Sequence, residues 1–439
     1  MEVFKVEGGH PLQGKINVQG AKNEALQIIA ATLLTDKPVL IKNLPDILDI
    51  RNQLSLLEIL GSDVERIDRH TVRIQTSNVD PERMKSDEFR RVAQRIRGSV
   101  LFVGPMVARY GQAFLPRPGG DRIGRRRLDA HIEALRTLGV RVTYDRKENA
   151  FLFVADNMHP AFIFLPEPSV TGTANAIMAA ATLNGHTTIY NAACEPYIQQ
   201  LCRLLNKMGC KIEGIGSNRL EIEGNPSLSG AEHTILPDMI EVGSFIGLAA
   251  LTGSDITIQN AGVEHLGQIP RTFEKLGIEL NIQGDDIHIP AHEIYEIETY
   301  LDGSILTISD GPWPLFTPDL LSVVLVTAIQ ARGSVLIHQK MFESRLFFID
   351  NLIDMGAQII LCDPHRATVI GMERRIPLRG IRMSSPDIRA GIALLIAALS
   401  AEGTSVIYNI EQIDRGYERI DERLKALGAH IERIPIYDK

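Results

Sequence analysis

The segment Ile420–Ile434, IDERLKALGAHIERI, contains the pattern that decides the fold. Its first part has apolar residues at helical spacing and ends at Leu427-Gly428, where glycine can supply the left-handed cap that ends a helix. Its second part, HIERI, alternates apolar and polar residues as a strand with one buried face does. The same Leu-Gly or Met-Gly pair recurs at intervals of about 68 to 79 residues, which indicates six copies of one repeat. The glycines of these pairs are Gly61, Gly139, Gly209, Gly277, Gly356 and Gly428.

A second helix and strand precede each of these pairs. The helix is rich in Ala, Ile and Leu and is apolar nearly all round, as in Asn23–Leu34 (NEALQIIAATLL) and Ile388–Gly403 (IRAGIALLIAALSAEG). We therefore expect it to be buried inside a domain, and the amphipathic Leu-Gly or Met-Gly helix to lie nearer solvent. The strand is β-branched and often ends in asparagine, at Asn43, Asn191, Asn260 and Asn409.

The alternation of strands and helices predicts an α/β protein. A chain of 439 residues is too long for one ordinary domain. We expect two domains of three repeats each, with the sheets outside and the helices inside. A linear solenoid of six repeats is the alternative, and the sequence has no long linker or low-complexity tract that decides between them.

Composition narrows the class of protein. The formal net charge of −8 and the pI near 5.9 argue against general nucleic-acid binding. The first residues, MEVFKVEGGHPLQGK, are too charged for a secretory signal peptide, and no apolar run approaches the roughly 20 residues that span a bilayer. We therefore expect a cytoplasmic protein. The cysteines lack CxxC pairing and are interpreted as reduced core thiols: Cys194, Cys202, Cys210 and Cys362.

Several familiar catalytic motifs are missing. The sequence contains no GxxxxGK[ST], no GxGxxG after a strand, no HExxH and no GxSxG elbow. ATP hydrolysis, nicotinamide redox chemistry and zinc proteolysis therefore lack their usual support, while a Ser-His-Asp triad stays open.

A basic loop stands out from this acidic chain. The stretch Leu115–His131, LPRPGGDRIGRRRLDAH, places five arginines around Asp121. This cluster indicates an anionic ligand. The alternative is that Asp121 is a solvated loop acid that pairs with Arg122 or Arg125.

The buried helices begin with polar residues that packing does not require. Helix N-termini attract anions, so converging N-termini would form an anion site. Lys22 opposes its helix dipole by about 0.3 to 1 kcal/mol, which an anion there would offset. For Asp319 and Asp387, helix capping is the alternative, because each follows Thr-Pro or Ser-Pro. The residues concerned are Lys22, Asn23, Arg97, Thr171, Gly172, Thr173, Asp319, Asp387 and Arg389.

Four motifs resemble those of the UDP-N-acetylglucosamine 1-carboxyvinyltransferase family. They are GAKNEAL at Gly20–Leu26, RPGGxxIGxR at Arg117–Arg126, LDAHI at Leu128–Ile132 and IDRGYERI at Ile413–Ile420. The resemblance covers essentially the whole chain. Lys-Asn after Gly-Ala separates this family from the sister transferase that acts on shikimate 3-phosphate, which opens with a GSKS-type motif.

The resemblance implies the enolpyruvyl transferase fold: two inside-out α/β barrel-like domains, each with three repeats of a βαβαββ-type unit. The domains are expected at 21–233, which carries the Asp121 loop, and at 1–20 plus 234–439. The family places its active site in the cleft between them.

The resemblance also implies the reaction. The enolpyruvyl group of phosphoenolpyruvate is transferred to the 3-hydroxyl of UDP-N-acetylglucosamine by addition and elimination, with release of phosphate. This is the first committed step of peptidoglycan precursor synthesis, which serves cell-wall biogenesis, cell shape and cell division. We expect no cofactor, no metal, no nucleic acid, no membrane and no obligatory protein partner.

Residue roles follow from the same resemblance. Asp319 matches the candidate base for the sugar hydroxyl, and Asp121 the position of the proton donor to C3 of phosphoenolpyruvate. Lys22 and Arg415 complete the expected catalytic set. Phosphoenolpyruvate is expected to contact Lys22, Asn23, Arg126, Arg345, Arg389 and Arg415. UDP-N-acetylglucosamine is expected to contact Asn23, Arg97, Arg126, Arg127, Leu128, Asp129, Val170, Thr171, Gly172, Asp319 and Met341.

The sequence departs from the family pattern at three positions. Most members carry cysteine where this chain has Asp121, and fosfomycin alkylates that cysteine, so we expect fosfomycin resistance. Pro168 stands near a family lysine, and Arg127 replaces a family proline.

Three other functions remain as alternatives. The first is transfer to shikimate 3-phosphate, and the second is a non-catalytic repeat scaffold. The third, an enzyme acting on nucleic-acid ends, conflicts with the acidic net charge.

Overall fold

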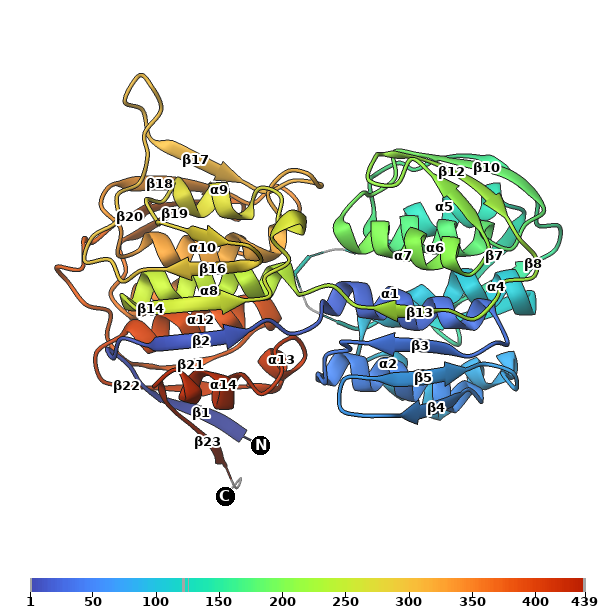
Figure 1. Cartoon of the computed structure of the whole chain (residues 1–439), viewed down its shortest axis with the longest axis horizontal. Coiled ribbons are helices and arrows are strands. Elements are labelled where there is room, and N and C mark those ends of the chain that lie inside the picture. Colours follow the sequence, from blue (N-terminus) through green and yellow to red (C-terminus); the bar gives the residue numbers. More distant parts are fainter. Residues whose placement is uncertain (1, 121–122, 125, 437–439) are drawn as a thin grey trace. The chain divides into compact units, whose positions relative to one another are not determined.

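The chain forms two compact units, which we describe separately. The computed structural model describes residues 2–120, 123–124 and 126–436. Unit 1 comprises residues 1–19, 122–125 and 237–439, and unit 2 comprises residues 20–121 and 126–236. Apart from the short stretch 122–125, the chain therefore leaves unit 1 after Gln19 and returns to it at Pro237, which the colours along the chain in Figure 1 show.

The described residues of unit 2 form three sheets. Their strand orders are β13-β3-β5-β4, β9-β10-β12-β11 and β6-β8-β7. The strands are β3 (Val39–Lys42), β4 (Asp63–Arg66), β5 (Val72–Gln75), β6 (Gln112–Pro116), β7 (Val140–Asp145), β8 (Ala150–Ala155), β9 (Phe162–Phe164), β10 (Gly185–Tyr190), β11 (Lys211–Glu213), β12 (Arg219–Gly224) and β13 (Glu232–Thr234). The helices are α1 (Lys22–Ala31), η1 (Thr32–Leu34), α2 (Leu48–Leu60), η2 (Pro81–Lys85), α3 (Asp87–Ala93), η3 (Arg97–Phe102), α4 (Val103–Tyr110), α5 (Asp129–Thr137), α6 (Val170–Ala180) and α7 (Pro196–Lys207).

The part of unit 1 that the structure describes also forms three sheets. Their strand orders are β2-β14-β16-β15, β17-β18-β20-β19 and β21-β22-β1-β23. The strands are β1 (Glu2–Glu7), β2 (Gln13–Asn17), β14 (Asp255–Gln259), β15 (Asn281–Gln283), β16 (Asp286–Ile289), β17 (Leu306–Ser309), β18 (Ser334–His338), β19 (Ile359–Asp363), β20 (Arg366–Ile370), β21 (Arg382–Ser384), β22 (Thr404–Tyr408) and β23 (His430–Pro435). The helices are α8 (Met239–Thr252), η4 (Val263–His265), α9 (Ile269–Glu274), η5 (Pro318–Leu320), α10 (Leu321–Ala328), α11 (Ile349–Asp354), α12 (Ile388–Ser400), α13 (Glu411–Asp414) and α14 (Ile420–Ala426).

One strand pattern recurs in five of the six sheets. A first strand pairs in parallel with the strand that follows the buried helix, and that strand pairs antiparallel with one member of an antiparallel strand pair. This pair is a hairpin in four of the sheets and consists of β1 and β23 in the fifth. The run β9-α6-β10-α7-β11-β12 is a continuous βαβαββ repeat of this kind. The predicted α/β repeat architecture is therefore confirmed. In the sixth sheet, β6-β8-β7, the described residues contain no such first strand.

Three strands complete repeats from which they are distant in sequence. β13 pairs with β3 at the start of unit 2, and β2 pairs with β14, which lies beyond the whole of unit 2. β1 pairs with β22 on one side and with β23 on the other. Both ends of the chain therefore meet in one sheet of unit 1, as Figure 1 shows.

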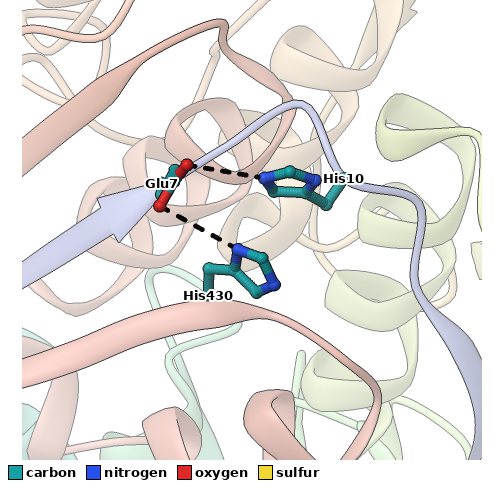
Figure 2. A group of neighbouring side chains, drawn as sticks. All are labelled: Glu7, His10 and His430. Carbon is teal, nitrogen blue, oxygen red and sulfur yellow. Dashed lines mark ion pairs between the residues drawn. The ribbon is translucent and has the colours of Figure 1, made fainter.

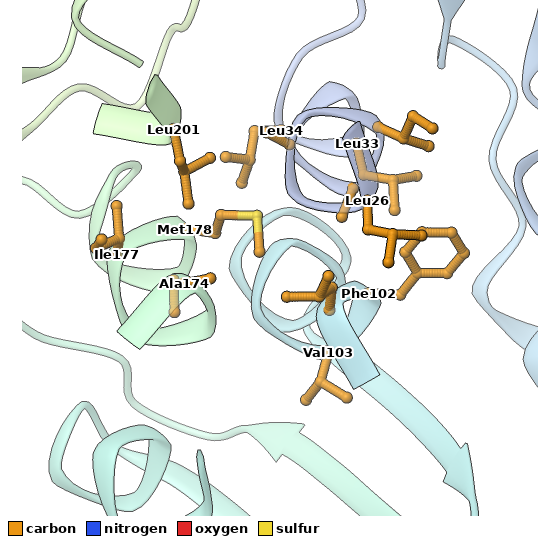
Figure 3. Packing of buried hydrophobic residues seen from close by; sticks show 14 of the residues in the cluster. Leu26, Leu33, Leu34, Phe102, Val103, Ala174, Ile177, Met178 and Leu201 are labelled. Atoms are coloured by element: carbon orange, nitrogen blue, oxygen red, sulfur yellow. The ribbon is translucent and has the colours of Figure 1, made fainter. Parts of the chain in front are cut away.

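The apolar helices are buried, as the sequence predicted. In unit 1, helices α8, α10 and α12 pack against one another, and every residue from Ile388 to Leu399 is buried. In unit 2, α4 packs on α6, while α1 packs on η3 and α7. Figure 3 shows Leu26, Phe102 and Met178 meeting in this core. No helix in the described part of the chain is long and apolar enough to cross a membrane.

Two local signals from the sequence have the expected conformations. The glycines of all six Leu-Gly and Met-Gly pairs have φ angles between 87° and 107°, the left-handed region in which they end a helix. The asparagines that end the strands are also left-handed, with φ of 55°, 61°, 54° and 56°. Their side chains bridge to the neighbouring parallel strand, since Asn191 Nδ2 donates to the Leu165 carbonyl at 2.9 Å and Asn409 Nδ2 to the Ser385 carbonyl at 2.8 Å.

Candidate functional site

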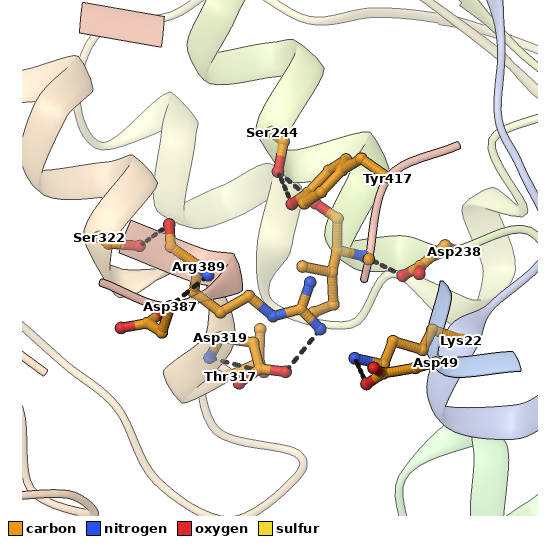
Figure 4. Close-up of polar contacts among 12 residues, drawn as sticks. Lys22, Asp49, Asp238, Ser244, Thr317, Asp319, Ser322, Asp387, Arg389 and Tyr417 are labelled. Carbon is orange, nitrogen blue, oxygen red and sulfur yellow. Dashed lines mark hydrogen bonds and ion pairs between the residues drawn. The ribbon is translucent and has the colours of Figure 1, made fainter. Parts of the chain in front are cut away.

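In unit 1, one carboxylate lies between two buried arginines. Asp319 is in the 3-10 turn η5, and its Oδ1 accepts from Arg345 Nη2 at 2.7 Å. Its Oδ2 accepts from Arg389 Nη2 at 3.0 Å, and Arg389 lies in the first turn of α12. Figure 4 shows Asp319 facing Arg389. Two cations around one carboxylate leave a local excess of positive charge.

The capping interactions at the starts of η5 and α12 explain why the Asp319 carboxylate binds arginines. Thr317 caps η5, because its Oγ1 accepts from the Asp319 backbone N–H at 3.4 Å. Asp387 does cap α12, because its Oδ1 accepts from the N–H groups of Arg389 and Ala390 at 2.8 and 3.0 Å. The capping alternative is therefore correct for Asp387, whereas the carboxylate of Asp319 binds arginines instead.

Arg345 and Arg415 are further buried cations of unit 1. Arg345 stacks on the Phe342 ring, with its guanidinium carbon 5.0 Å from the ring centroid. Its Nε and Nη1 have no hydrogen-bond partner among the described residues. Arg415 ends α13 and donates from Nη1 to Gln412 Oε1 at 2.8 Å. The unpartnered donors of the buried Arg345 guanidinium are suited to an anionic ligand.

Asp310 positions the backbone that carries Met341. Its carboxylate accepts from the N–H groups of Lys340 and Met341 and from the Gln339 side chain. Burial raises the pKa of Asp310, and the hydrogen bonds oppose this shift. The Met341 side chain itself is exposed. Asp310 was not predicted from the sequence. It directly follows β17, and in other repeats the residue at this position accepts the hydrogen bond from the left-handed asparagine.

In unit 2, Lys22 begins α1 and forms a buried ion pair. Its Nζ lies 2.6 Å from Asp49 Oδ2, and the two side chains are 7% and 4% exposed (Figure 4). Asp49 is in the first turn of α2. The sequence predicted an anion to offset Lys22, and the structure places a carboxylate of the chain itself beside it. Asn23 follows and is half-buried.

A second group in unit 2 surrounds Arg97 at the start of η3. Arg97 Nη2 donates to the carbonyls of Arg126 and Arg127, at 3.0 and 3.3 Å. Burial, together with the charge of Arg126, lowers the pKa of Arg97 to about 10. Arg127 is followed by Leu128, which is buried, and by Asp129, which begins α5 and is exposed. Arg97 and Arg126 each carry a positive charge, and the two charges repel each other. A bound anion would reduce this repulsion.

The start of α6 adjoins this second group through His131. His131 Nε2 lies 2.8 Å from Thr171 Oγ1. Burial and the charges of Arg97 and Arg126 lower the pKa of His131 to about 3, so the imidazole is neutral near pH 7. Val170 is the first residue of α6. Ser169 Oγ caps this helix by accepting a hydrogen bond from the Gly172 N–H at 3.2 Å. A Cβ at Gly172 would lie 3.1 Å from Ala130 Cβ, so α5 and α6 approach closely here.

The structure thus gathers the expected site residues into separate groups. Asp319, Arg345 and Arg389 meet in unit 1, and Arg97, Arg126, Arg127 and Leu128 meet in unit 2. Asp121 lies outside the described residues. Asp49, His131 and Asp310 were missed. Only His131 gave a signal, as part of the LDAHI motif.

Solved structures share this fold. The enolpyruvyl transferase NikO from Streptomyces tendae aligns over 98% of both chains, with a TM-score of 0.86 and 22% identity. An EPSP synthase from Acinetobacter baumannii aligns over 99% of this chain and 100% of its own, with a TM-score of 0.74 and 16% identity. The model of the EPSP synthase (3-phosphoshikimate 1-carboxyvinyltransferase) family matches residues 6–424. The protein is therefore of the enolpyruvyl transferase class, and its fold is the one expected.

Curated relatives narrow the class. A UDP-N-acetylglucosamine 1-carboxyvinyltransferase of Porphyromonas gingivalis is 60% identical over 434 residues, 99% of this chain and 100% of the relative. One from Bradyrhizobium diazoefficiens is 50% identical over 98% of both chains. The chain belongs to the UDP-N-acetylglucosamine 1-carboxyvinyltransferase family, and it is a transferase.

Proposed function

We propose that the protein transfers the enolpyruvyl group of phosphoenolpyruvate to the 3-hydroxyl of UDP-N-acetylglucosamine and releases phosphate. The names of its full-length relatives support this acceptor. The observation in the structure that carries the proposal is the Asp319 carboxylate held between Arg345 and Arg389. The reaction would take place in the cytoplasm and commit the sugar nucleotide to peptidoglycan synthesis.

Asp319 is the proposed base. The attacking sugar hydroxyl must lose a proton as it adds to C2 of phosphoenolpyruvate, and a carboxylate within hydrogen-bond reach can take it. Arg345 and Arg389 each hold one carboxylate oxygen, so Asp319 has a fixed orientation. A base whose orientation is fixed before the substrate binds needs no reorganisation during the reaction.

The proposed role of the cations is to bind the phosphate and carboxylate of phosphoenolpyruvate. Arg345 offers Nε and Nη1, a pair of donors with the fork geometry that carboxylates and phosphates accept. Preorganised positive charge would also stabilise the charge that develops as phosphate departs. The residues proposed for this role are Lys22, Asn23, Arg126, Arg345, Arg389 and Arg415.

The start of α6 is the proposed site for the nucleotide diphosphate. Helix N-termini present free N–H groups and partial positive charge to phosphates. Thr171 and Gly172 lie in the first turn of α6, next to the group around Arg97. The residues proposed to contact the UDP-sugar are Asn23, Arg97, Arg126, Arg127, Leu128, Asp129, Val170, Thr171, Gly172, Asp319 and Met341.

The test is phosphate release from phosphoenolpyruvate with two acceptors, UDP-N-acetylglucosamine and shikimate 3-phosphate. We expect release with the UDP-sugar alone. Asp319→Asn should lower kcat by about 10² to 10⁴, the range that a general base contributes. Asp363→Asn, which disrupts the Asp363–Arg366 surface pair of unit 1, is the matched control and should have normal turnover. Release with shikimate 3-phosphate, or with neither acceptor, would refute the proposal.

Asp121 is the proposed proton donor to C3, and it predicts resistance to fosfomycin. The wild-type protein should gain no fosfomycin adduct by mass spectrometry, whereas Asp121→Cys should gain one per chain. The native cysteines serve as the internal control, since Cys362 is exposed and Cys194, Cys202 and Cys210 are buried. Asp121→Asn should lose turnover across pH 5 to 9. A stoichiometric adduct on the wild-type protein would contradict this role.

A further inference from the structure

We propose that Glu7, His10 and His430 form a binding site for a divalent transition-metal ion such as Zn²⁺, which would join the two ends of the chain in unit 1. Figure 2 shows the three side chains turned toward one another, with the Glu7 carboxylate facing both rings. Among the described residues they are the one group of three His, Cys, Asp or Glu side chains with such proximity, their ligand atoms lying within 4.8 Å of one another.

The backbone places the three ligands. Glu7 ends β1 and lies directly opposite His430, the first residue of β23, in the antiparallel register. Gly8 and Gly9 then turn the chain back, and Gly9 has a φ of 80°. A Cβ at Gly8 would lie 2.1 Å from the Ala398 carbonyl oxygen, so only glycine fits where this turn meets the end of α12. The turn is fixed by the Gly8 N–H donating to Gly403 O at 3.1 Å and the Gly9 N–H to Leu399 O at 2.9 Å.

The three side chains are close to a metal-binding geometry, and no hydrogen bond joins the Glu7 carboxylate to either ring. Glu7 Oε1 is 3.9 Å from His10 Nε2, and Glu7 Oε2 is 4.0 Å from His430 Nδ1. Both distances exceed a hydrogen bond. Tetrahedral zinc with bonds of about 2.1 Å would bring its ligand atoms to about 3.4 Å from one another. The side chains are between 44% and 63% exposed, so rotamer changes can close the remaining distance.

The donor set selects the class of metal. Two imidazole nitrogens and one carboxylate suit Zn²⁺ and its transition-metal neighbours, whereas Mg²⁺ and Ca²⁺ prefer oxygen ligands. The ring centroids of His10 and His430 are 4.2 Å apart, so both rings can contact one ion. A shared metal ion binds both rings in their neutral form. The exposed site leaves a fourth position for water.

The test is a calorimetric titration of Zn²⁺ into tag-free, EDTA-treated protein. We expect one ion per chain. His10→Ala and His430→Ala should each weaken binding by at least about tenfold, and excess Mg²⁺ should not compete. His186→Ala is the matched control, because His186 is an exposed histidine 2.9 Å from one carboxylate, that of Glu221, and it should bind as wild type does. Unchanged affinity in both test variants, or no binding to wild type, would overturn the proposal.

A second measurement detects the predicted link between the strands. Zn²⁺ should slow hydrogen exchange of backbone amides in residues 3–7 and 431–435 of wild type, because a ligand that binds only the paired strands suppresses their opening. The conservative Glu7→Gln variant should lose this effect and keep the wild-type circular dichroism spectrum. Phosphate release should be the same in all these variants, because the three residues are not among the proposed active-site groups. Equal slowing in Glu7→Gln would contradict the assignment.

Discussion

At the scale of single residues, several buried charges in the described part of the chain are matched by partners on other elements. Lys22 on α1 pairs with Asp49 on α2, and Asp319 on η5 pairs with Arg345 and Arg389. Removing one member of a buried pair is costly because it leaves the other charge in a medium of low polarity. Lys22, Asp319, Arg345 and Arg389 are also proposed ligand-binding groups, whereas Asp49 is not, so variants of the pairs can separate effects on stability from effects on turnover.

Lys22→Ala should abolish turnover and also lower the free energy of unfolding by about 3 kcal/mol, because Asp49 keeps its buried charge without Lys22. The measurements are phosphate release and urea unfolding. The double variant Lys22→Ala, Asp49→Ala should recover most of the stability but none of the turnover. Near-normal turnover in the single variant would remove Lys22 from the site.

His131 makes stability depend on pH. Its pKa is about 3 in the folded protein, below the ordinary value of about 6.5 for an unfolded chain. Between these values the unfolded state binds a proton that the folded state does not. Stability should therefore fall by about 1.4 kcal/mol for each pH unit below about 6.5. In urea unfolding at pH 5, 6 and 7, His131→Gln should show a shallower decline than wild type, and equal slopes would contradict the prediction.

At the scale of elements, left-handed asparagines connect four central strands to their parallel neighbours. Asn43, Asn191 and Asn409 each end a strand and donate to the carbonyl that follows the adjoining strand. Asparagine tolerates the left-handed conformation better than other residues with a side chain, and its amide supplies the donor. In the β17–β18 sheet, Gln339 follows β18 and takes the place of the asparagine, and its side chain donates to the Asp310 carboxylate after β17.

Asn191→Ala should destabilise unit 2 by about 2 kcal/mol, because alanine is strained at a φ of 61° and cannot donate to Leu165. Asn191→Gly removes only the hydrogen bond and should cost about 1 kcal/mol. The free energies of unfolding of the two variants measure the two effects separately. Equal losses in both would mean that strain contributes nothing.

Features set by nearby residues were predictable from the sequence. The left-handed glycines, the buried apolar helices and the strands that end in asparagine depend on local chemistry and are confirmed. The partners of the candidate site residues were not predictable. Asp49, His131 and Asp310 act through contacts with residues distant in the sequence, such as His131 with Thr171 forty positions away. A single sequence does not show which side chains of different elements face each other.

At the scale of the whole molecule, the two units differ in how the chain supplies them. All strands of unit 2 lie between residues 20 and 236, whereas unit 1 draws β1 and β2 from before that stretch. Residues 20–236 expressed alone should therefore fold cooperatively, since their sheets are complete. Residues 237–439 alone should not, because the sheets of β14 and β22 would lack β2 and β1. Thermal unfolding monitored by circular dichroism distinguishes the two outcomes.

The pairing of β1 with β22 and β23 also affects the order of events during synthesis. A ribosome adds about 5 to 20 residues per second, so roughly 20 to 80 s pass between the making of β1 and that of β22, the first of its partner strands to be made. Throughout this interval β1 has no native partner strand. The outward charges of Glu2, Lys5 and Glu7 then act before folding as well as after it, because charged residues on an unpaired strand discourage aggregation with other nascent chains.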